Sequence, residues 1–190
     1  MSRIARKLPS IRFMEKAAQK RIPKFAFDYL QGGIGAEACL ARNRSALDSI
    51  QLAPRYLLPR SIRPELNITL FGQELPLPFS PAPLGLSGLI WPNAMEKISR
   101  VTTAKGIPLG LSTFATSSLE EIGCISEDLL WFQLYCTADE SIENDLMRRA
   151  HDIGCRTIIV TVDIPTATRR EKDIANGLSI PPKISLSNIA

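Results

Sequence analysis

The spacing of hydrophobic positions changes along the 190-residue chain, and the change separates three parts. In the first part, apolar positions recur every three or four residues, which predicts helices over residues 10–20, 24–31 and 36–47. Pro23 suits the first turn of the second helix, and Gly32-Gly33 suits its end. Phe25 and Tyr29 are i,i+4 neighbours in that helix, and this spacing alone favours a packed core tyrosine over a functional one.

The second part, residues 51–78, is rich in proline and has only short apolar runs. Residues 67–70 and 73–75 flank Phe71-Gly72, a pattern that predicts a small hairpin. Apolar residues recur throughout this part, so we interpret it as an arm or lid and not as a flexible linker. The predicted organisation is therefore a helical segment (1–50), a proline-rich arm (51–78) and a main domain (79–190).

The third part alternates short apolar runs with amphipathic stretches. The runs predict strands, the amphipathic stretches predict helices, and a helix follows each of the first three strands. Such alternation is typical of parallel βαβ units with right-handed crossovers in an α/β fold. The predicted strands cover residues 78–86, 107–112, 129–135 and 157–163, and the predicted helices cover residues 94–105, 117–122 and 140–152.

Each predicted strand ends in polar or glycine-bearing residues. The clearest case is 157–163, where a β-branched run turns polar at Thr161 and Asp163 before Pro165. The carboxyl ends of parallel barrel strands converge on one face, where ligands bind. We therefore expect the four strand ends to share a site, formed by Pro83-Leu84-Gly85, Ser112-Thr113, Gln133 with Tyr135, and Thr161 with Asp163.

Composition narrows the function classes without changing this picture. The chain is 45% hydrophobic and 22% charged, which is ordinary for a globular domain with a real core. Its net charge is +4, but Lys and Arg are spread out, so the sequence disfavours nucleic-acid binding. A mildly basic surface would suit anionic small substrates or an anionic membrane face. We expect no signal peptide and no membrane-spanning segment.

The four cysteines form no C-x-x-C pair and the chain has one histidine, so we expect no metal site. Buried free thiols in a reducing cytoplasm are the favoured interpretation.

Taken together, the motifs resemble one known family. In order, they are Phe27-Asp28-Tyr29 with Gly32-Gly33; Ala82-Pro83-Leu84-Gly85-Leu86; Leu111-Ser112-Thr113; Trp131-Phe132-Gln133-Leu134-Tyr135; and Thr161-Val162-Asp163-Ile164-Pro165 with Arg169-Arg170-Glu171-Lys172-Asp173. The chain resembles the N-terminal half of the FMN-dependent 2-hydroxy acid oxidases and dehydrogenases, which include glycolate oxidase, L-lactate dehydrogenase and (S)-mandelate dehydrogenase. Gly85-Leu86-Ser87-Gly88 before Trp91-Pro92 is most similar to the mandelate and lactate dehydrogenase branch.

The resemblance implies a (β/α)8 TIM-barrel fold, of which this chain covers the N-terminal helical segment and roughly the first four βα units. It implies FMN as cofactor and a small L-2-hydroxy acid, lactate- or mandelate-like, as substrate, oxidised to the 2-oxo acid. The implied flavin contacts are the backbone at Pro83, Leu84 and Gly85 and the side chains of Ser112, Gln133 and Thr161.

The resemblance also implies the substrate-facing groups. Tyr29 and Arg170 would hold the substrate carboxylate, and Arg suits this role through its planar, two-pronged donor geometry. Tyr135 would hydrogen-bond the substrate oxygen as it becomes a carbonyl. Asp163 would orient the catalytic histidine and stabilise its protonated form. Phe114 would help to shape the pocket.

The family's catalytic histidine lies in a His-Gly-Gly-Arg segment, beside a second substrate arginine and near the flavin phosphate site, and this sequence contains no such segment. We expect the one histidine, His151, to be a surface residue and not the catalytic base. The resemblance therefore leaves open whether the chain is active by itself. The alternative function is a truncated, non-catalytic half-barrel, or a split-enzyme piece that needs a C-terminal partner.

The last stretch of the sequence bears on partners and location. Residues 180–186 fall where bacterial relatives begin a loop that attaches to membrane, so we expect a cytoplasmic protein that is peripheral to the inner face of the membrane. We expect no closing strand, which would leave the edge of the fourth strand unpaired. The expected partners are the 2-hydroxy acid and either further copies, since the family forms tetramers, or a complementary C-terminal half. A generic small-molecule binding module would explain the polar strand ends but not the ordered motifs.

Overall fold

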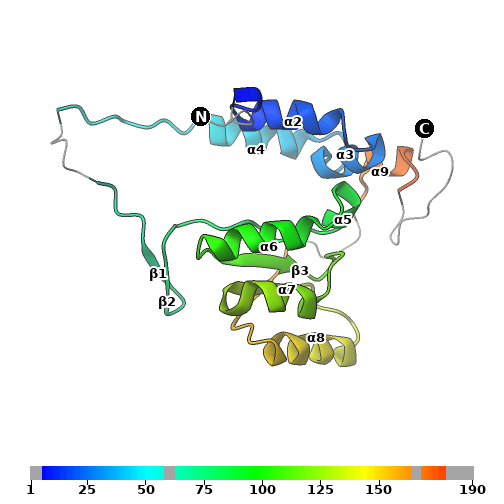
Figure 1. Cartoon of the computed structure of the whole chain (residues 1–190). Helices are drawn as coiled ribbons and strands as arrows, with labels where there is room; N and C mark the ends of the chain where they lie inside the picture. The colour runs from blue at the N-terminus through cyan, green and yellow to red at the C-terminus, as the bar shows by residue number, and fades with distance from the viewer. Residues whose placement is uncertain (1–5, 58–62, 164–167, 179–190) are drawn as a thin grey trace. The chain divides into compact units, whose positions relative to one another are not determined.

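The computed structural model describes residues 6–57, 63–163 and 168–178 (Figure 1). The chain forms two compact units, one of Met1–Tyr56 with Thr166–Ala190 and one of Leu57–Pro165. The sequence-based division at residues 50 and 78 stays a prediction.

The first unit is helical. It contains α2 (Ile11–Gln19), α3 (Lys24–Gln31) and α4 (Ala38–Asp48), which confirm the three predicted helices. Pro23 is the N-cap of α3 and Gly32 is its C-cap, which agrees with the helix start and end predicted from the sequence.

A short helix, α9 (Glu171–Ala175), completes the first unit and was not predicted. Five residues are too few to produce a helical period, and contacts with the earlier helices hold α9 in place. Asn176 Nδ2 donates to Asp28 Oδ2 at 2.8 Å, and Lys172 Nζ lies 2.8 Å from Glu37 Oε2. The sequence motif around Arg170 is thereby packed on α3 and the start of α4.

The second unit begins with the predicted hairpin. Strands β1 (Ile68–Leu70) and β2 (Gln73–Leu75) pair antiparallel around Phe71-Gly72. Both turn residues have positive φ, 53° and 76°, the backbone signature of a tight two-residue turn that suits the strand twist. The ring of Phe71 meets Trp131 edge-on at 6.0 Å. Beside the hairpin lies an apolar pocket of about 150 Å³, which includes Pro108 and Trp131 in its lining.

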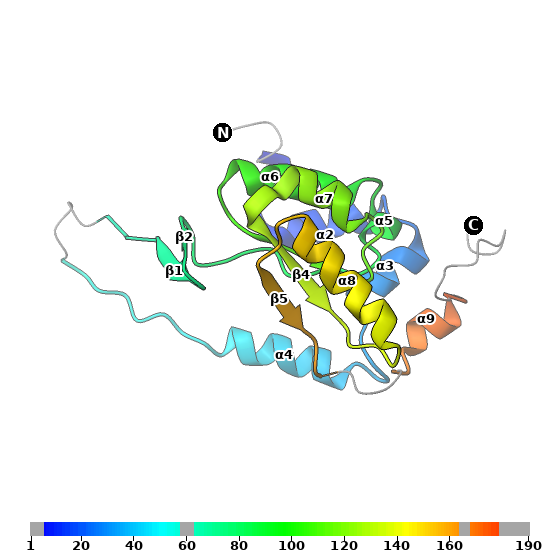
Figure 2. The same ribbon diagram turned by 90° about the horizontal axis from the view of Figure 1, so that it is seen from below.

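A three-stranded parallel sheet is the centre of the second unit. Its strands are β3 (Leu109–Ser112), β4 (Leu130–Leu134) and β5 (Thr157–Val160), in the order β3-β4-β5. The intervening helices are α6 (Ala94–Ala104) before β3, α7 (Leu119–Ser126) with the short 3-10 helix η1 (Glu127–Leu129) before β4, and α8 (Glu140–Asp152) before β5 (Figure 2). This order confirms the predicted α/β fold with parallel βαβ units.

The predicted strand at 78–86 is wrong. The structure has no strand there, and a short helix, α5 (Ser87–Ile90), follows. Pro78, Pro81 and Pro83 have no N–H to donate, so the segment cannot form a regular ladder with β3. One weak link joins it to the sheet, from Gly110 N–H to Pro81 O at 3.4 Å.

Strand alternation gives the sheet two chemically different faces. One face packs against α6, α7 and α8 and forms a contiguous apolar core, made of Met95, Leu109, Leu111, Leu119, Ile122, Leu130, Phe132, Leu134 and Ala150. The other set of positions includes Gly110, Ser112 and Gln133, where small and polar side chains replace the aliphatic ones. The polar set therefore lies on the face opposite the helical layer.

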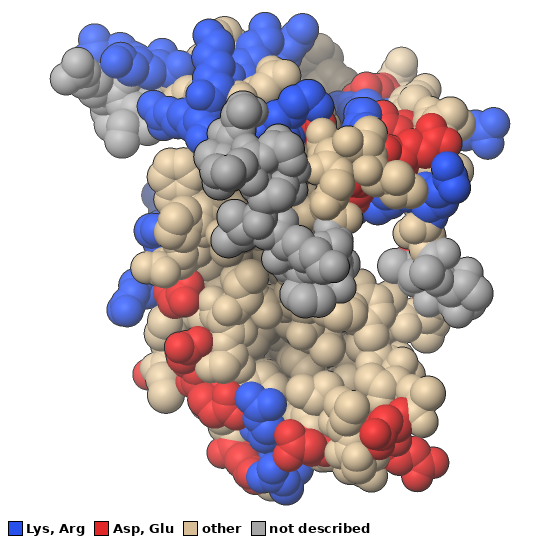
Figure 3. All heavy atoms as spheres, turned by 90° about the vertical axis from the view of Figure 1, so that its right-hand side faces the viewer, with Lys and Arg blue, Asp and Glu red and all other residues tan. Residues whose placement is uncertain are grey.

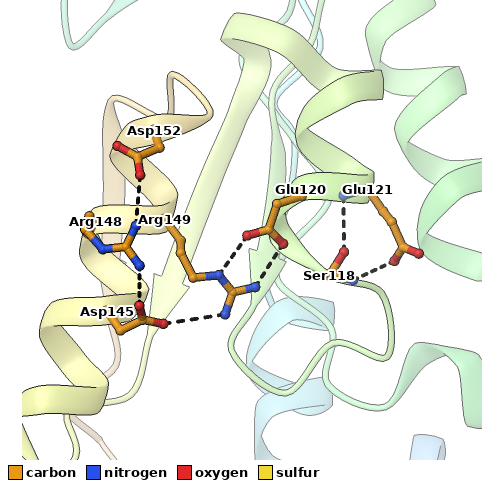
Figure 4. A network of polar contacts seen from close by, with 7 residues as sticks. All are labelled: Ser118, Glu120, Glu121, Asp145, Arg148, Arg149 and Asp152. Carbon is orange, nitrogen blue, oxygen red and sulfur yellow. Dashed lines mark hydrogen bonds and ion pairs between the residues drawn. The ribbon is translucent and has the colours of Figure 1, made fainter.

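The layer of helices is braced by polar contacts between α7 and α8 (Figure 4). A capping box begins α7: Glu121 N–H donates to Ser118 Oγ at 3.2 Å, and Ser118 N–H donates to Glu121 Oε2 at 2.9 Å. Arg149 on α8 then holds Glu120 with two hydrogen bonds, of 2.7 and 2.9 Å. This paired geometry lowers the pKa of Glu120 to about 2.

The prediction of buried thiols is largely wrong. All four cysteines are free, but Cys39, Cys124 and Cys136 are exposed and only Cys155 is half-buried. Burial raises the pKa of the Cys155 thiol. Cysteine is buried so often that composition alone misplaced the other three, whose positions on helix surfaces or after a strand decide their exposure.

Candidate functional site

Three side chains from three neighbouring strand ends form a continuous hydrogen-bonded row, the Ser112–Gln133–Thr161 row. Ser112 Oγ donates to Gln133 Oε1 at 2.9 Å, and Gln133 Nε2 donates to Thr161 Oγ1 at 2.8 Å. Ser112 and Gln133 are buried, whereas Thr161 is half-buried. The sequence predicted all three residues, and the structure brings them into direct contact.

Sheet register explains why these three side chains meet. Ser112 and Gln133 are direct partners across the β3–β4 pair, so their side chains project from the same face. Thr161 continues β5 by one further backbone bond, from its N–H to Leu134 O at 3.0 Å. Thr161 therefore lies diagonally beyond Gln133 on the same face, within reach of its amide.

The backbone around the row is tied down as well. Thr113 N–H and Thr113 Oγ1 both donate to Gln133 O, at 3.0 and 2.6 Å, and Phe114 N–H donates to Ser112 Oγ at 3.1 Å. After these bonds, the row still offers the Thr161 hydroxyl hydrogen and one Gln133 amide hydrogen. It can thus donate to the polar edge of a bound uncharged ligand without rearranging. Thr113 was predicted as part of this polar strand end but without a role of its own, and its hydroxyl fixes the Gln133 carbonyl.

The predicted backbone segment Pro83-Leu84-Gly85 runs beside β3. Pro83 and Gly85 are half-buried, and Leu84 is exposed. A Cβ added to Gly110 would lie only 2.8 Å from Pro83 Cγ, so the glycine in β3 is what lets this segment approach the sheet. Leu86 N–H donates to Phe114 O at 2.8 Å, which fixes the far end of the segment.

Tyr135 and Asp163 lie beyond the row. Tyr135 is half-buried, and its ring is tilted against that of Phe114 with centroids 5.2 Å apart. This contact joins two residues that the sequence placed around the substrate. Asp163 is exposed, and it makes no hydrogen bond or ion pair with the rest of the described chain. The structure therefore does not connect Asp163 with the Ser112–Gln133–Thr161 row.

Tyr29 and Arg170 belong to the first unit, where they contact each other directly. Arg170 Nη2 donates to Tyr29 O at 2.6 Å and to Gly32 O at 3.0 Å. The guanidinium carbon lies 4.9 Å from the centroid of the Tyr29 ring, a cation–π distance. The two residues predicted to hold a carboxylate are thus neighbours despite their separation in sequence.

Asp173 supports Arg170 from the first turn of α9. Its Oδ2 lies 3.0 Å from Arg170 Nε, and both side chains are largely buried. Burial raises the pKa of Asp173, and the nearby Arg170 charge opposes that rise. By contrast, hydrogen bonds from Lys24 and then Asn176 lower the pKa of Asp28. Asp173 belongs to the Arg169–Asp173 motif, but no role was predicted for it, although its i,i+3 spacing from Arg170 indicates an ion pair.

His151 lies on the surface, as predicted. Its side chain is 90% exposed on α8, with Nδ1 3.6 Å from Asp152 Oδ1. It belongs to the outer face of the helical layer, and the polar row lies on the other side of the sheet. His151 is therefore not placed to serve as the base of this site.

The fold and the row define a class of protein first. Parallel strand–helix units with polar groups at successive carboxyl strand ends are the architecture of ligand-binding α/β barrels, here present in part, since the described strands form no closed barrel. The family follows from comparison: the chain belongs to the FMN-dependent dehydrogenase family, whose model matches residues 18–190.

Individual relatives agree with this assignment. The chain is 36% identical to 4-hydroxymandelate oxidase of Amycolatopsis orientalis over 183 residues, which is 94% of this chain and 50% of that protein. It is 40% identical to L-lactate dehydrogenase of Caulobacter sp. (strain K31) over 166 residues, which is 87% of this chain and 43% of that protein.

Solved structures show the same pattern. A crystal structure of mandelate oxidase superposes with a TM-score of 0.84 at 35% identity, over 96% of this chain and 53% of that chain. The monotopic membrane protein (S)-mandelate dehydrogenase gives a TM-score of 0.87 at 31% identity, over 96% and 48%. The chain therefore spans about half the length of these relatives. These matches confirm the predicted resemblance to an N-terminal part of such proteins.

Proposed function

We propose that this chain supplies the N-terminal half of an FMN-dependent enzyme that oxidises a small L-2-hydroxy acid, lactate- or mandelate-like, to the 2-oxo acid. The observation that carries the proposal is the Ser112–Gln133–Thr161 row at three adjacent strand ends of a chain in this family. The activities named for the relatives, on 4-hydroxymandelate and L-lactate, support the substrate class.

The residues present fit FMN. An isoalloxazine edge is uncharged and needs fixed donors and acceptors, and the row keeps one hydroxyl and one amide hydrogen for that purpose. The row would bind the ring, and the backbone at Pro83, Leu84 and Gly85 would lie against it. When bound, FMN would supply the two-electron redox chemistry, and the protein would supply orientation and charge.

The substrate-facing roles complete the proposal. Arg170 and Tyr29 would hold the carboxylate of the 2-hydroxy acid, and their mutual contact supports a shared role. Tyr135 would hydrogen-bond the oxygen that becomes a carbonyl, with Phe114 packed on its ring. Asp163 would orient a catalytic histidine supplied from outside this sequence, since a carboxylate beside an imidazole stabilises its charged form.

The second candidate is a non-catalytic half-barrel, or a split-enzyme piece completed by a C-terminal partner. The observation that favours it is the position of the one histidine, His151, which is exposed on α8 and not near the row. In this version the row forms part of a flavin site that the partner completes. Further copies of the chain, as tetramers, are the alternative assembly.

We extend the proposal to location. The protein would act in the cytoplasm, peripheral to the inner face of the membrane, through the loop that begins at residues 180–186, which lie outside the described residues. A structural neighbour described as a monotopic membrane protein supports this placement. Within residues 6–57, 63–163 and 168–178, no helix is long and apolar enough to cross a membrane.

The experiment begins with the purified 190-residue chain. FMN binding is titrated by flavin fluorescence, and reduction of an artificial acceptor is assayed with L-lactate and (S)-mandelate. Tight flavin binding with turnover would contradict the half-barrel candidate. Flavin binding and turnover that appear only after a C-terminal half is added would support the split version. No flavin binding in either case would contradict the FMN proposal.

One substitution ties the result to the row. We expect Gln133→Leu to weaken FMN binding about tenfold or more, because it removes the amide that joins Ser112 to Thr161 and one donor to the ring. Gln51→Leu makes the same change at an exposed position and should leave FMN binding unaltered. Equal FMN affinity in the two variants would count against the role of the row.

A further inference from the structure

Helix α2 (Ile11–Gln19) is amphipathic and has no buried residue. Its apolar side chains, Ile11, Phe13, Met14, Ala17 and Ala18, fall within one half of the helical wheel, and the polar ones fall within the other. Ile11 is 77% exposed, Phe13 54% and Met14 44%. Three large apolar side chains on one short helix are thus in contact with solvent.

The same helix lies in a basic stretch. Residues 6–24 contain seven Lys and Arg and one acidic residue, Glu15. Glu15 accepts a hydrogen bond from Gln31 Nε2 at 2.6 Å. Within the described residues, no ion pair neutralises the charges of Arg12, Lys16, Lys20 or Arg21.

The charge pattern differs elsewhere on the molecule. Figure 3 shows Lys and Arg side chains gathered over much of the helical part at the top of the view, with Asp and Glu beside them at its right, whereas both signs are interspersed over the lower part that holds α7 and α8. On α8, for example, Arg148 and Arg149 are each paired with carboxylates. The positive charge around α2 is therefore local and uncompensated, and does not simply reflect the net charge of the chain.

We propose that α2 docks on an anionic lipid surface, with Ile11, Phe13 and Met14 inserted at the boundary between headgroups and acyl chains. A short amphipathic helix with an apolar face and basic flanks is suited to lie in the plane of such an interface. Lys16 and Lys20 follow Phe13 by three and seven residues, so they lie along one edge of the apolar face and reach the headgroups as it inserts.

Charge complementarity selects this partner over a second copy of the chain. Two α2 helices packed face to face would bring like charges together, which opposes association. An anionic bilayer instead attracts each cation near its surface while the apolar side chains leave water. This contact is separate from the loop at residues 180–186 and from the proposed redox function, because it uses neither the strand ends nor flavin.

The test is flotation of the full chain with vesicles. We expect binding to phosphatidylcholine vesicles that contain about one third phosphatidylglycerol, much weaker binding to pure phosphatidylcholine, and release in 0.5 M NaCl, where surface charges are screened. Equal binding to both vesicle types, or no binding to either, would overturn the proposal.

Matched double variants locate the contact. Lys16→Glu with Lys20→Glu should weaken binding about 30-fold or more, since each cation near the surface contributes about a fivefold factor. Arg100→Glu with Lys105→Glu makes the same charge change at exposed positions of the second unit and should leave most of the binding intact. An equal loss in both pairs would show a general charge effect and overturn the assignment to α2.

The apolar contribution is tested separately. Phe13→Ser should reduce binding to the anionic vesicles, and Val101→Ser, at a position 61% exposed on α6, should not. Circular dichroism of each variant establishes that the fold is kept. Unchanged vesicle binding by Phe13→Ser, or a dimer in sedimentation that Phe13→Ser abolishes while vesicles are not bound, would contradict lipid docking.

Discussion

At the scale of single residues, the site depends on side chains that satisfy one another. The amide of Gln133 accepts from Ser112 and donates to Thr161, so a buried polar group that would otherwise be costly is paired on both sides. The same principle holds for Arg170, whose guanidinium is shared among two carbonyls, an aromatic ring and Asp173. Fixed partners of this kind orient the groups before a ligand arrives.

Gly110 gives a prediction at this scale. We expect Gly110→Ala to destabilise the second unit by about 1–3 kcal/mol, because the new Cβ would lie 2.8 Å from Pro83 Cγ and would force the loop from the sheet. Urea unfolding followed by tryptophan fluorescence measures the effect, since Trp91 and Trp131 both belong to that unit. Gly33→Ala, whose Cβ would meet Leu40 at an ordinary 3.5 Å, serves as the benign control under circular dichroism.

At the scale of elements, the helices hold the strand ends in register. Helix α7 connects β3 to β4, and its core residues Leu119 and Ile122 pack on the sheet. Its N-terminus is closed by the Ser118–Glu121 capping box, and its outer face is joined to α8 through Glu120 and Arg149 (Figure 4). Both devices thus fix the first turn of the helix that connects two site strands.

The capping box is testable by one substitution. Ser118→Ala removes the oxygen that accepts from Glu121 N–H, so we expect a loss of about 1 kcal/mol in the free energy of unfolding. Ser118→Asp keeps an acceptor at the N-cap and should restore most of that stability. Urea unfolding followed by tryptophan fluorescence compares the two variants. Equal destabilisation by alanine and aspartate would show that the cap is not the cause.

The contact between Glu120 and Arg149 predicts a pH dependence. The pKa of Glu120 is lowered to about 2 by its hydrogen bonds from Arg149, below its ordinary value of 4.5. A depressed folded-state pKa gives stability that is present above pH 4.5 and is lost as the pH falls towards 2. We expect Glu120→Gln to flatten the decline of the melting temperature between pH 5 and pH 2. Glu65→Gln, at an exposed position, should keep the parent slope.

At the scale of the whole molecule, the described sheet ends at β5. No further strand of the described chain pairs with that edge, and Val160 there is 49% exposed. An unpaired, apolar strand edge is a template for association with another strand. The chain also spans about half the length of its relatives, which makes this edge the natural place for the continuation of a barrel.

The open edge predicts self-association of the isolated chain. We expect Val160→Lys to reduce concentration-dependent association in light scattering after size exclusion, because a lysine on an edge strand disfavours strand pairing. Val101→Lys places the same side chain on an exposed helix position and should leave association unchanged. If the two variants associate alike, the β5 edge is not the contact.

Much of the fold could be read from the sequence because its signals are local. Helix α8 was predicted with the bounds that the structure shows, since its capping and periodicity lie within one segment. Short continuous apolar runs located β3, β4 and β5, and Phe71-Gly72 located the hairpin turn. The strand prediction for residues 78–86 was wrong because it followed the apolar content of the segment. The prolines there lack the N–H groups that a strand needs for pairing. Helix α9 was not predicted because it is stabilised by contacts with α3 and α4, which are distant in sequence.

The sequence by itself determined which residues are polar at the strand ends, and family motifs attached roles to them that remain predictions. Only the tertiary structure decided that Ser112, Gln133 and Thr161 bond in one row, that Arg170 lies on Tyr29, and that Asp163 contacts none of them. The physical reason is that a side chain's type is fixed along the chain, whereas its partners depend on strand register and on packing between segments distant in sequence. A shift of one residue in the β3–β4 register would turn Ser112 and Gln133 to opposite faces of the sheet, and the hydrogen bond between them would be lost.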